Sequence, residues 1–268
     1  MSFLIGLFVF IFGASIGSFL NVVILRLPDG KTLNGFSHCP NCNHRLGFFD
    51  LFPILSFVFL LGKCRYCKKT ISRRYFYIEL ITALLTLITY LIFPFYNFYT
   101  LIYFLRALLI LYVLISVFII DYEHFIILDG IILFGSVSVA ICSGILDYIS
   151  ASMLTWNSLL LVGLLSGLGL ATFFYIQYLL SKGKWIGLGD IKFAFFLGIA
   201  TPFPSIIATI LLAYFIGAFI GLALILFKGA KLKSEVPFGT FLSAACLIAL
   251  YYGYPLMQWY LKLIGLRY

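Results

Sequence analysis

The sequence predicts an all-α polytopic membrane protein with about eight transmembrane helices and a small cytoplasmic zinc-ribbon-like loop. Two observations carry this prediction. Of the 268 residues, 63% are hydrophobic and only 10% are charged, whereas soluble domains are rarely more than about half apolar. Long apolar runs recur along the chain, and one basic segment with two Cys-x-x-Cys pairs interrupts them near the N-terminus.

The first apolar run covers residues 3–25 and has no Lys or Arg before it. About 20 apolar residues span a bilayer as a helix, so this run is long enough. A secretory signal would show a basic leader and a small-residue cleavage site, so we expect this helix to be retained. Its small residues from Gly13 to Ser18 should let another helix approach closely.

The next segment, residues 26–75, has a different composition. It carries nine of the 18 basic residues, and it contains the cysteines Cys39, Cys42, Cys64 and Cys67. Basic loops of membrane proteins stay in the cytoplasm, where thiols remain reduced, so metal binding is favoured over disulfides. Within this segment the apolar stretch Phe48–Leu61 is too short and too broken to span, and we expect it at the membrane interface.

The cysteine spacing is typical of a zinc site. Each Cys-x-x-Cys can form a tight knuckle that directs two thiolates at one ion, and 21 residues separate Cys42 from Cys64. Two knuckles complete the tetrahedral shell of four sulfurs that structural zinc prefers. His38 and His44 are close enough to substitute, but four cysteines already fill the shell. The alternative is a set of reduced or redox-active thiols without a metal.

Further apolar runs follow at about 76–94, 98–120, 125–146, 157–180, 190–201, 204–227 and 237–260. The run at 190–201 gives under about 20 Å of helix at about 1.5 Å per residue, so we expect a tilted or half-inserted helix.

The basic residues are distributed as the positive-inside rule requires. With the N-terminus outside, 15 of the 18 fall on the cytoplasmic side, namely the nine of the first loop and Lys182, Lys184, Lys192, Lys228, Lys231 and Lys233. Lys262 and Arg267 lie outside, and Arg106 lies within a span. Because the net charge of +9 follows membrane topology, we expect a lipid bilayer and no nucleic acid as partner.

Two aspartates lie at the ends of apolar runs on the predicted cytoplasmic side. Asp190 ends the motif Gly187-Leu188-Gly189-Asp190, and Asp121 closes the run before His124. Carboxylates at a membrane boundary are costly unless they are solvated, paired or protonated. Two close carboxylates that share one proton supply the base and the acid of peptide hydrolysis, so the pair predicts an intramembrane aspartic protease. The alternative is two unrelated helix-end carboxylates, with Asp190 as an N-cap.

Other polar residues near the pair have simpler interpretations. His124 could share a helix face with Asp121, but no serine or cysteine nucleophile is marked out beside it. Glu123 and Asp129 are more often solvated or loop-fixing residues. Lys192 could balance charge near the pair, but we expect it to mark the cytoplasmic interface. We therefore expect the catalytic residues to be Asp121 and Asp190.

Together these motifs resemble the type IV prepilin peptidase family over nearly the full length. The resemblance rests on Gly17-Ser18-Phe19-Leu20-Asn21-Val22-Val23, Arg26-Leu27-Pro28, both cysteine pairs, Ile71-Ser72-Arg73-Arg74-Tyr75 with Glu79, Asp121, the Gly-Leu-Gly-Asp at 187–190 with Lys192, and Pro237-Phe238-Gly239. A lone Gly-x-Gly-Asp would be weak, but several motifs in family order are specific.

The resemblance implies a bacterial inner-membrane enzyme of type IV pilus assembly and protein secretion. It implies cleavage of the basic leader of prepilins or pseudopilins after a glycine, with Asp121 and Asp190 as the catalytic pair. It also implies N-methylation of the new N-terminus with S-adenosylmethionine. The expected organisation is a first helix at 1–25, a zinc-binding loop at 26–75 and a peptidase core at 76–268.

The chain departs from the family pattern at three places. It has Leu128 where proline often precedes the aspartate, Leu51-Phe52-Pro53 where Asn-Ile-Pro is frequent, and Thr240 where Pro-Phe-Gly-Pro is frequent. None of these removes a catalytic aspartate. The rival functions are a zinc-containing membrane scaffold and an ion-coupled transporter, although a transporter would place its charges near the bilayer midplane in both halves.

Overall fold

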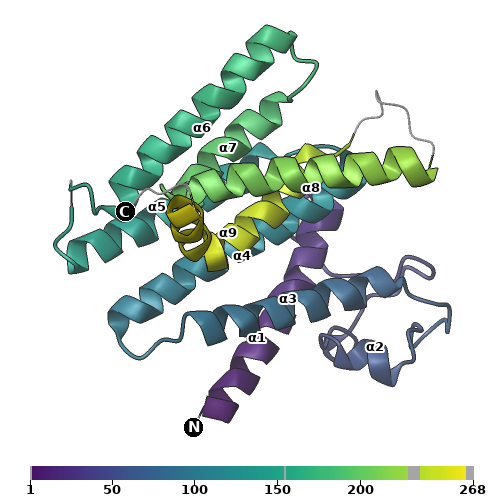
Figure 1. Ribbon diagram of the computed structural model, residues 1–268. Coiled ribbons are helices and arrows are strands. Elements are labelled where there is room, and N and C mark those ends of the chain that lie inside the picture. The colour runs from purple at the N-terminus through teal and green to yellow at the C-terminus, as the bar shows by residue number, and fades with distance from the viewer. Residues whose placement is uncertain (1, 154, 229–235, 264–268) are drawn as a thin grey trace. The chain divides into compact units, whose positions relative to one another are not determined.

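The protein is described by a computed structural model that covers residues 2–153, 155–228 and 236–263 (Figure 1). Within these residues the regular elements are helical, and seven helices are long and apolar enough to cross a membrane. The eighth expected run is a shorter helix, α7 (Leu188–Ala200). The predicted all-α membrane fold is therefore confirmed. Of the basic residues used for topology, Lys231, Lys233 and Arg267 lie outside the described residues.

The chain forms two compact units, Met1–Pro94 and Phe95–Tyr268. In the first unit, α1 (Ser2–Arg26) packs against α3 (Arg73–Ile92). A Cβ atom added at Gly13 would lie 2.9 Å from the Ala83 Cα, and one added at Gly17 would lie 2.8 Å from the Glu79 Cα. Only glycine permits this approach, so the expected close-packing face of the first helix is confirmed.

The loop between α1 and α3 holds two short elements, the 3-10 helix η1 (Phe48–Asp50) and α2 (Leu55–Phe59). They correspond to the apolar stretch that the sequence marks as too short to span. Two isolated antiparallel bridges, His38 with Arg45 and Lys63 with Thr70, frame the cysteine pairs.

The second unit contains α4 (Phe98–His124), α5 (Asp129–Ile149), α6 (Leu159–Ser181), α7, α8 (Ser205–Lys228) and α9 (Phe238–Leu263). Helix α4 packs against α5 and α9, while α7 packs against α5, α6 and α9. Because α4 contacts helices on two sides, more of its surface is buried than that of the other long helices. The C-terminal end of α4, which carries Asp121, is thereby held inside the unit.

Helix α7 lies alongside α6, as the two green ribbons in Figure 1 show. A Cβ atom added at Gly198 would overlap the backbone of Gly167, so the two backbones touch. Phe193, Phe196 and Leu197 are fully buried. Although α7 is short, it is therefore a core element of the second unit.

The far end of α7 is held by a buried arginine. Arg106 of α4 is 3% exposed and donates hydrogen bonds to the carbonyls of Ile199 (2.7 Å) and Ala200 (3.1 Å) and to Ser143 Oγ (2.8 Å). The last carbonyls of a helix have no partner within the helix. Arg106 satisfies two of them, and it fixes the position of α7 along its own axis.

Candidate active site and metal centre

The four loop cysteines form one cluster in the first unit. Their Sγ atoms all lie within 4.8 Å of one another, and those of Cys39 and Cys67 are 3.9 Å apart. A tetrahedral zinc ion with Zn–S bonds of about 2.3 Å requires sulfurs about 3.8 Å apart. The cluster therefore fits a metal ion with four sulfur ligands, and thiolates are ligands that zinc prefers.

The two knuckles have the same backbone geometry. In the first, the Asn43 amide donates to the Cys39 carbonyl and the Cys39 amide to the His44 carbonyl. In the second, the Lys68 amide donates to the Cys64 carbonyl and the Cys64 amide to the Lys69 carbonyl. The residue after each pair is left-handed, with φ of 54° at Asn43 and 59° at Lys68. The same turn thus directs two thiols at one point from each side.

The two thiols of the first knuckle differ in pKa. Hydrogen bonding from the Asn41 backbone lowers the pKa of the Cys39 thiol to about 7, against the opposing effect of burial. Despite a hydrogen bond from the His44 backbone, burial and the hydrogen bonds with Cys39, Cys67 and Cys64 raise the pKa of the Cys42 thiol to about 11. A thiol must lose its proton to bind a metal, so of these two Cys39 is the more easily deprotonated ligand.

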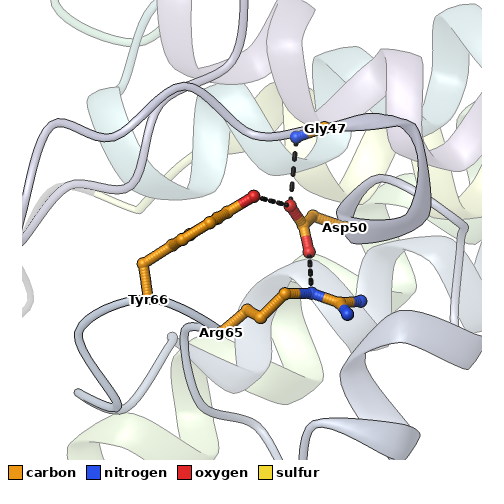
Figure 2. A network of polar contacts seen from close by, with 4 residues as sticks. All are labelled: Gly47, Asp50, Arg65 and Tyr66. Carbon is orange, nitrogen blue, oxygen red and sulfur yellow. Dashed lines mark hydrogen bonds and ion pairs between the residues drawn. The ribbon is translucent and has the colours of Figure 1, made fainter.

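Asp50 joins the segment that follows the first knuckle to Arg65 and Tyr66 of the second, as Figure 2 shows. One carboxylate oxygen accepts from the Gly47 amide (3.0 Å) and the Tyr66 hydroxyl (3.1 Å), and the other pairs with Arg65 Nε at 2.6 Å. Arg65 and Tyr66 lie between Cys64 and Cys67. Burial opposes the charge of Asp50, but the hydrogen bonds from Arg65, Gly47 and Tyr66 outweigh it, so its pKa is lowered.

The second unit brings Asp121 to the N-terminus of α9. Asp121 is 5% exposed, and its Oδ2 accepts from the Thr240 amide (2.8 Å) and the Thr240 hydroxyl (3.2 Å). A Cβ atom added at Gly239 would lie 2.9 Å from the same oxygen, so glycine is required there. Amides at the start of a helix stabilise negative charge, which suits a carboxylate held inside the unit.

Asp190 lies in the first turn of α7, where its Oδ2 accepts from the Gly187 amide at 3.0 Å. The N-cap residue of α7 is therefore Gly187, and Asp190 lies three residues further on. The alternative that Asp190 is itself the N-cap is wrong. Burial, together with the negative charge of Asp121, raises the pKa of Asp190 to about 6 despite that hydrogen bond. A carboxyl with such a pKa can hold a proton near neutral pH.

Two glycines associated with the aspartates meet at one side chain, Ile127. A Cβ atom added at Gly189, next to Asp190, would lie 3.1 Å from Ile127 Cβ, and one at Gly239 would lie 3.0 Å from Ile127 Cδ1. Gly239 also packs on Asp121, as described above. Segments that lie far apart in the sequence thus meet at Ile127, and the charge of Asp121 acts on Asp190.

The neighbouring charged residues lie apart from this arrangement. Lys192 Nζ pairs with Asp129 Oδ2 at 2.7 Å, and both side chains are more than half exposed. His124 Nε2 lies 4.0 Å from Glu123 Oε2. The Lys192–Asp129 contact is a surface ion pair, which contributes little to stability.

Sequence reasoning missed Thr240 as a partner of Asp121. The only sequence signal was its place after Pro237-Phe238-Gly239, where we noted a departure from a frequent proline. Proline has no amide hydrogen and no hydroxyl, so both hydrogen bonds depend on the residue that this chain has at 240. From the sequence we could say only that Arg106 lies within a membrane span. Its hydrogen bonds to the carbonyls at the end of α7 were not predicted.

The fold and the two sites define a multi-pass helical membrane protein with four cysteines that fit a metal ion and a buried aspartate whose charge acts on a second one. Residues 11–93 match the Bacterial Peptidase A24 N-terminal domain, and residues 107–222 match the Type IV leader peptidase family. The chain belongs to the type IV prepilin peptidase family, and it is a peptidase of the bacterial inner membrane.

Curated relatives agree with this assignment. The prepilin leader peptidase/N-methyltransferase of Aeromonas hydrophila is 31% identical over 283 residues, which cover 94% of this chain and 92% of the relative. That of Aeromonas salmonicida is 31% identical over 287 residues (96% and 94%), and that of Pseudomonas aeruginosa is 28% identical over 280 residues (95% and 93%). No solved structure matches the chain.

Proposed function

We propose that the chain is an aspartic endopeptidase that cleaves the basic leader of type IV prepilins or pseudopilins after a glycine, on the cytoplasmic side. The observation that supports this best is the contact of Gly189, next to Asp190, and of Gly239, which packs on Asp121, with the same side chain, Ile127. Donors from α9 hold Asp121, and its charge acts on Asp190. We further propose that it methylates the new N-terminus, as the names of its relatives suggest.

In the proposed mechanism the aspartate pair holds one proton and one water molecule. The ionised carboxylate takes a proton from the water, whose oxygen attacks the carbonyl carbon of the scissile bond. The protonated carboxyl then gives its proton to the leaving amine as the carbon–nitrogen bond breaks. The Thr240 amide and hydroxyl orient Asp121 through this exchange, and the raised pKa of Asp190 keeps a proton available within the pair.

The cysteine cluster has a structural role in this proposal. Cys39, Cys42, Cys64 and Cys67 would hold one zinc ion, which closes the loop between α1 and α3. A four-sulfur shell leaves no open position for substrate or water, so we assign no step of the hydrolysis to it.

The proposed orientation places the N-terminus outside and both aspartates at the cytoplasmic side. Lys182, Lys184 and Lys192 are exposed at the α7 end that carries Asp190. The connections at the opposite ends of the second unit's helices, residues 93–97, 150–158 and 201–204, contain no Lys or Arg. This asymmetry is the one that the positive-inside rule requires.

The decisive experiment replaces each aspartate in the purified protein and follows cleavage of a prepilin-like peptide by mass spectrometry. Asp121→Asn and Asp190→Asn should each abolish cleavage, since asparagine keeps the shape but cannot exchange the proton. Both residues act on one water, so the double variant should be no worse than either single one.

The matched controls are Asp129→Asn and Glu123→Gln, which neutralise exposed carboxylates close in sequence. Both should retain substantial turnover. Cleavage by Asp121→Asn together with loss in Asp129→Asn would show that Asp190 has a different partner. If neither Asp121 nor Asp190 matters, the protein is better explained as a zinc-containing scaffold.

A further inference from the structure

A cavity of about 260 Å³ lies entirely within the first unit, beside the cysteine cluster. Its walls come from α1, the loop and α3, and hydrolysis uses none of them. Three of its lining residues have a carboxylate or amide oxygen in the side chain, namely Asn21, Asp50 and Glu79. Two of these, Asn21 and Glu79, belong to the motifs that the peptidase mechanism leaves without a role.

Glu79 is a buried carboxylate with neutral partners. It is 9% exposed, and its Oε2 accepts from the Ile54 amide at 2.7 Å. The Ser18 side chain supplies a further hydrogen bond. No described residue forms an ion pair with Glu79, whereas Asp50, the other carboxylate of the cavity, is paired with Arg65. A buried carboxylate without a cation is costly, so a cationic ligand would stabilise it.

Asn21 lacks a hydrogen-bond donor for its oxygen. The side chain is 3% exposed, and its Nδ2 donates to the Tyr75 carbonyl at 3.2 Å. A carbonyl can only accept, so the amide nitrogen must face Tyr75 and the oxygen must face elsewhere. That Oδ1 is buried and has no partner among the described residues. Buried polar atoms without a partner are rare in native proteins and call for an explanation.

The principal cation in the cavity wall is directed elsewhere. The Arg26 guanidinium donates to the carbonyls of Leu33, Asn34 and Phe36, each at 3.1 Å. Those bonds fix the loop that follows α1. Arg65 is paired with Asp50, and Lys63, the third Lys or Arg of the lining, is exposed and forms no ion pair among the described residues. The carboxylate of Glu79 and the oxygen of Asn21 are therefore left as acceptors without a charged donor.

The backbone that faces Glu79 is strained. Ile54 has φ of 61° and ψ of −54°, and the Leu55 amide donates to the Pro53 carbonyl across it. This is the γ-turn with positive φ, which residues other than glycine adopt only at a cost, β-branched residues most of all. In this turn the Ile54 amide faces Glu79, so the carboxylate is held in one place.

We propose that this cavity binds an organic ammonium group, with the Glu79 carboxylate and Asn21 Oδ1 as its acceptors. The inference rests on the methylation proposed above, because both reactants of that step carry such a group. One is the α-ammonium of S-adenosylmethionine, and the other is the N-terminal ammonium of the cleaved polypeptide. A volume of about 260 Å³ lies just below the range of about 300–1,000 Å³ that is usual for whole-ligand cavities. The cavity can therefore hold the methionine part of S-adenosylmethionine or the N-terminal residue of the polypeptide, but not either ligand in full.

The test measures binding to the full-length protein in lipid nanodiscs by calorimetry. The probes are S-adenosylmethionine and two forms of a mature-sequence peptide, with a free or an acetylated N-terminus. Glu79→Gln keeps the shape and can still accept from Ile54, but it loses the charge. A hydrogen bond to a charged group is worth about tenfold or more in affinity, so binding of the cationic probe should fall by at least about tenfold.

Asn21→Leu is the second variant, and Asp29→Asn, which neutralises an exposed carboxylate outside the cavity, is the matched control. Asn21→Leu should also weaken binding, and the control should bind like the wild type. Leader cleavage and zinc content should stay at wild-type levels in all three, which excludes misfolding as the cause. For the peptide, Glu79→Gln should abolish the preference for the free over the acetylated N-terminus, an effect that a merely structural role would not produce.

Each outcome bears on the proposal. Loss of S-adenosylmethionine binding alone assigns the cavity to the methyl donor, and loss of free-amine peptide binding alone assigns it to the acceptor. If the wild type methylates and binds both probes but Glu79→Gln and Asn21→Leu are unchanged, the cavity proposal is wrong and the proposed function stands. If the wild type neither methylates nor binds a probe while cleavage persists, both the cavity and the methylation proposals fail.

Discussion

Asp50 has a structural task in a chain with only nine acidic residues. In the sequence it merely interrupts an apolar stretch, and nothing there indicates its partners. In the structure it joins the segment after the first knuckle to Arg65 and Tyr66 of the second. The geometry of the cysteine cluster therefore depends on a carboxylate that is not a ligand, as is common around metal sites.

We predict that Asp50→Asn loosens the metal centre without removing a ligand. Wild-type protein purified without added metal should contain about one zinc ion per chain, and the variant should lose it several-fold faster to a chelator. The pKa of Asp50 is lowered, so its stabilising effect is complete above the unfolded pKa of about 3.9 and disappears only as pH falls through the folded value. The difference between variant and wild type should thus be constant between about pH 6 and 8. Equal zinc loss in both proteins would contradict this role.

The site residues differ in how far their partners can be predicted from the sequence. The cysteine cluster could be predicted because each Cys-x-x-Cys spacing is local, and it brings two thiols together without contacts from distant parts of the chain. The partner of Asp121 could not, because Thr240 lies on another helix and only tertiary packing brings the two together. Asn21 and Glu79 were visible as motif residues, but their shared cavity needs the contact between α1 and α3.

At the scale of single elements, α7 is the helix on which the candidate active site depends. One end carries Asp190 and the other is bound by Arg106. Its apolar run and approximate length could be read from the sequence, since glycines precede it and prolines follow. Its place against α6 could not, because the contact is made by Gly167 and Gly198, which look like many other glycines in apolar helices.

We predict that Arg106→Leu displaces α7 and lowers both stability and cleavage. The change leaves the carbonyls of Ile199 and Ala200 and the Ser143 hydroxyl with one donor fewer, in an apolar interior. Each group left unpaired costs about 1–3 kcal/mol. The melting temperature in detergent should therefore fall by several degrees, and cleavage should be largely lost.

Arg106→Lys should recover part of both properties, since lysine keeps the charge but cannot reproduce the planar fork of the guanidinium. Arg73→Leu, at an exposed arginine, is the control and should behave like the wild type. A stable Arg106→Leu protein with full activity would show that α7 needs no anchor at this end.

At the scale of the whole molecule, hydrophobic pattern and charge gave the membrane class and the number of apolar segments. This is because a bilayer accepts few shapes, and every spanning segment must satisfy its own backbone. The division into Met1–Pro94 and Phe95–Tyr268 is less accessible from sequence. From the sequence we grouped the helix after the basic loop with the later helices. In the structure that helix, α3, packs on α1, and this contact places it in the first unit.

We predict from the proposed orientation that a cysteine introduced at Trp156, between α5 and α6, reacts with a membrane-impermeant maleimide in intact cells. A cysteine at Lys184, between α6 and α7, should react only after permeabilisation. Both positions are exposed. The parent protein should stay unlabelled in intact cells if the loop cysteines face the cytoplasm. Labelling at Lys184 from outside would reverse the topology and place Asp190 on the opposite side.

The hydrogen bonds from Thr240 to Asp121 also set an order of events during synthesis. A growing chain carries both aspartates before the ribosome has reached residue 240, but Asp121 then lacks the donors that hold it. On the proposed assignment, the site is completed only when α9 has been made and inserted. A nascent chain that stops short of α9 would therefore carry both aspartates without the donors that orient Asp121 for hydrolysis.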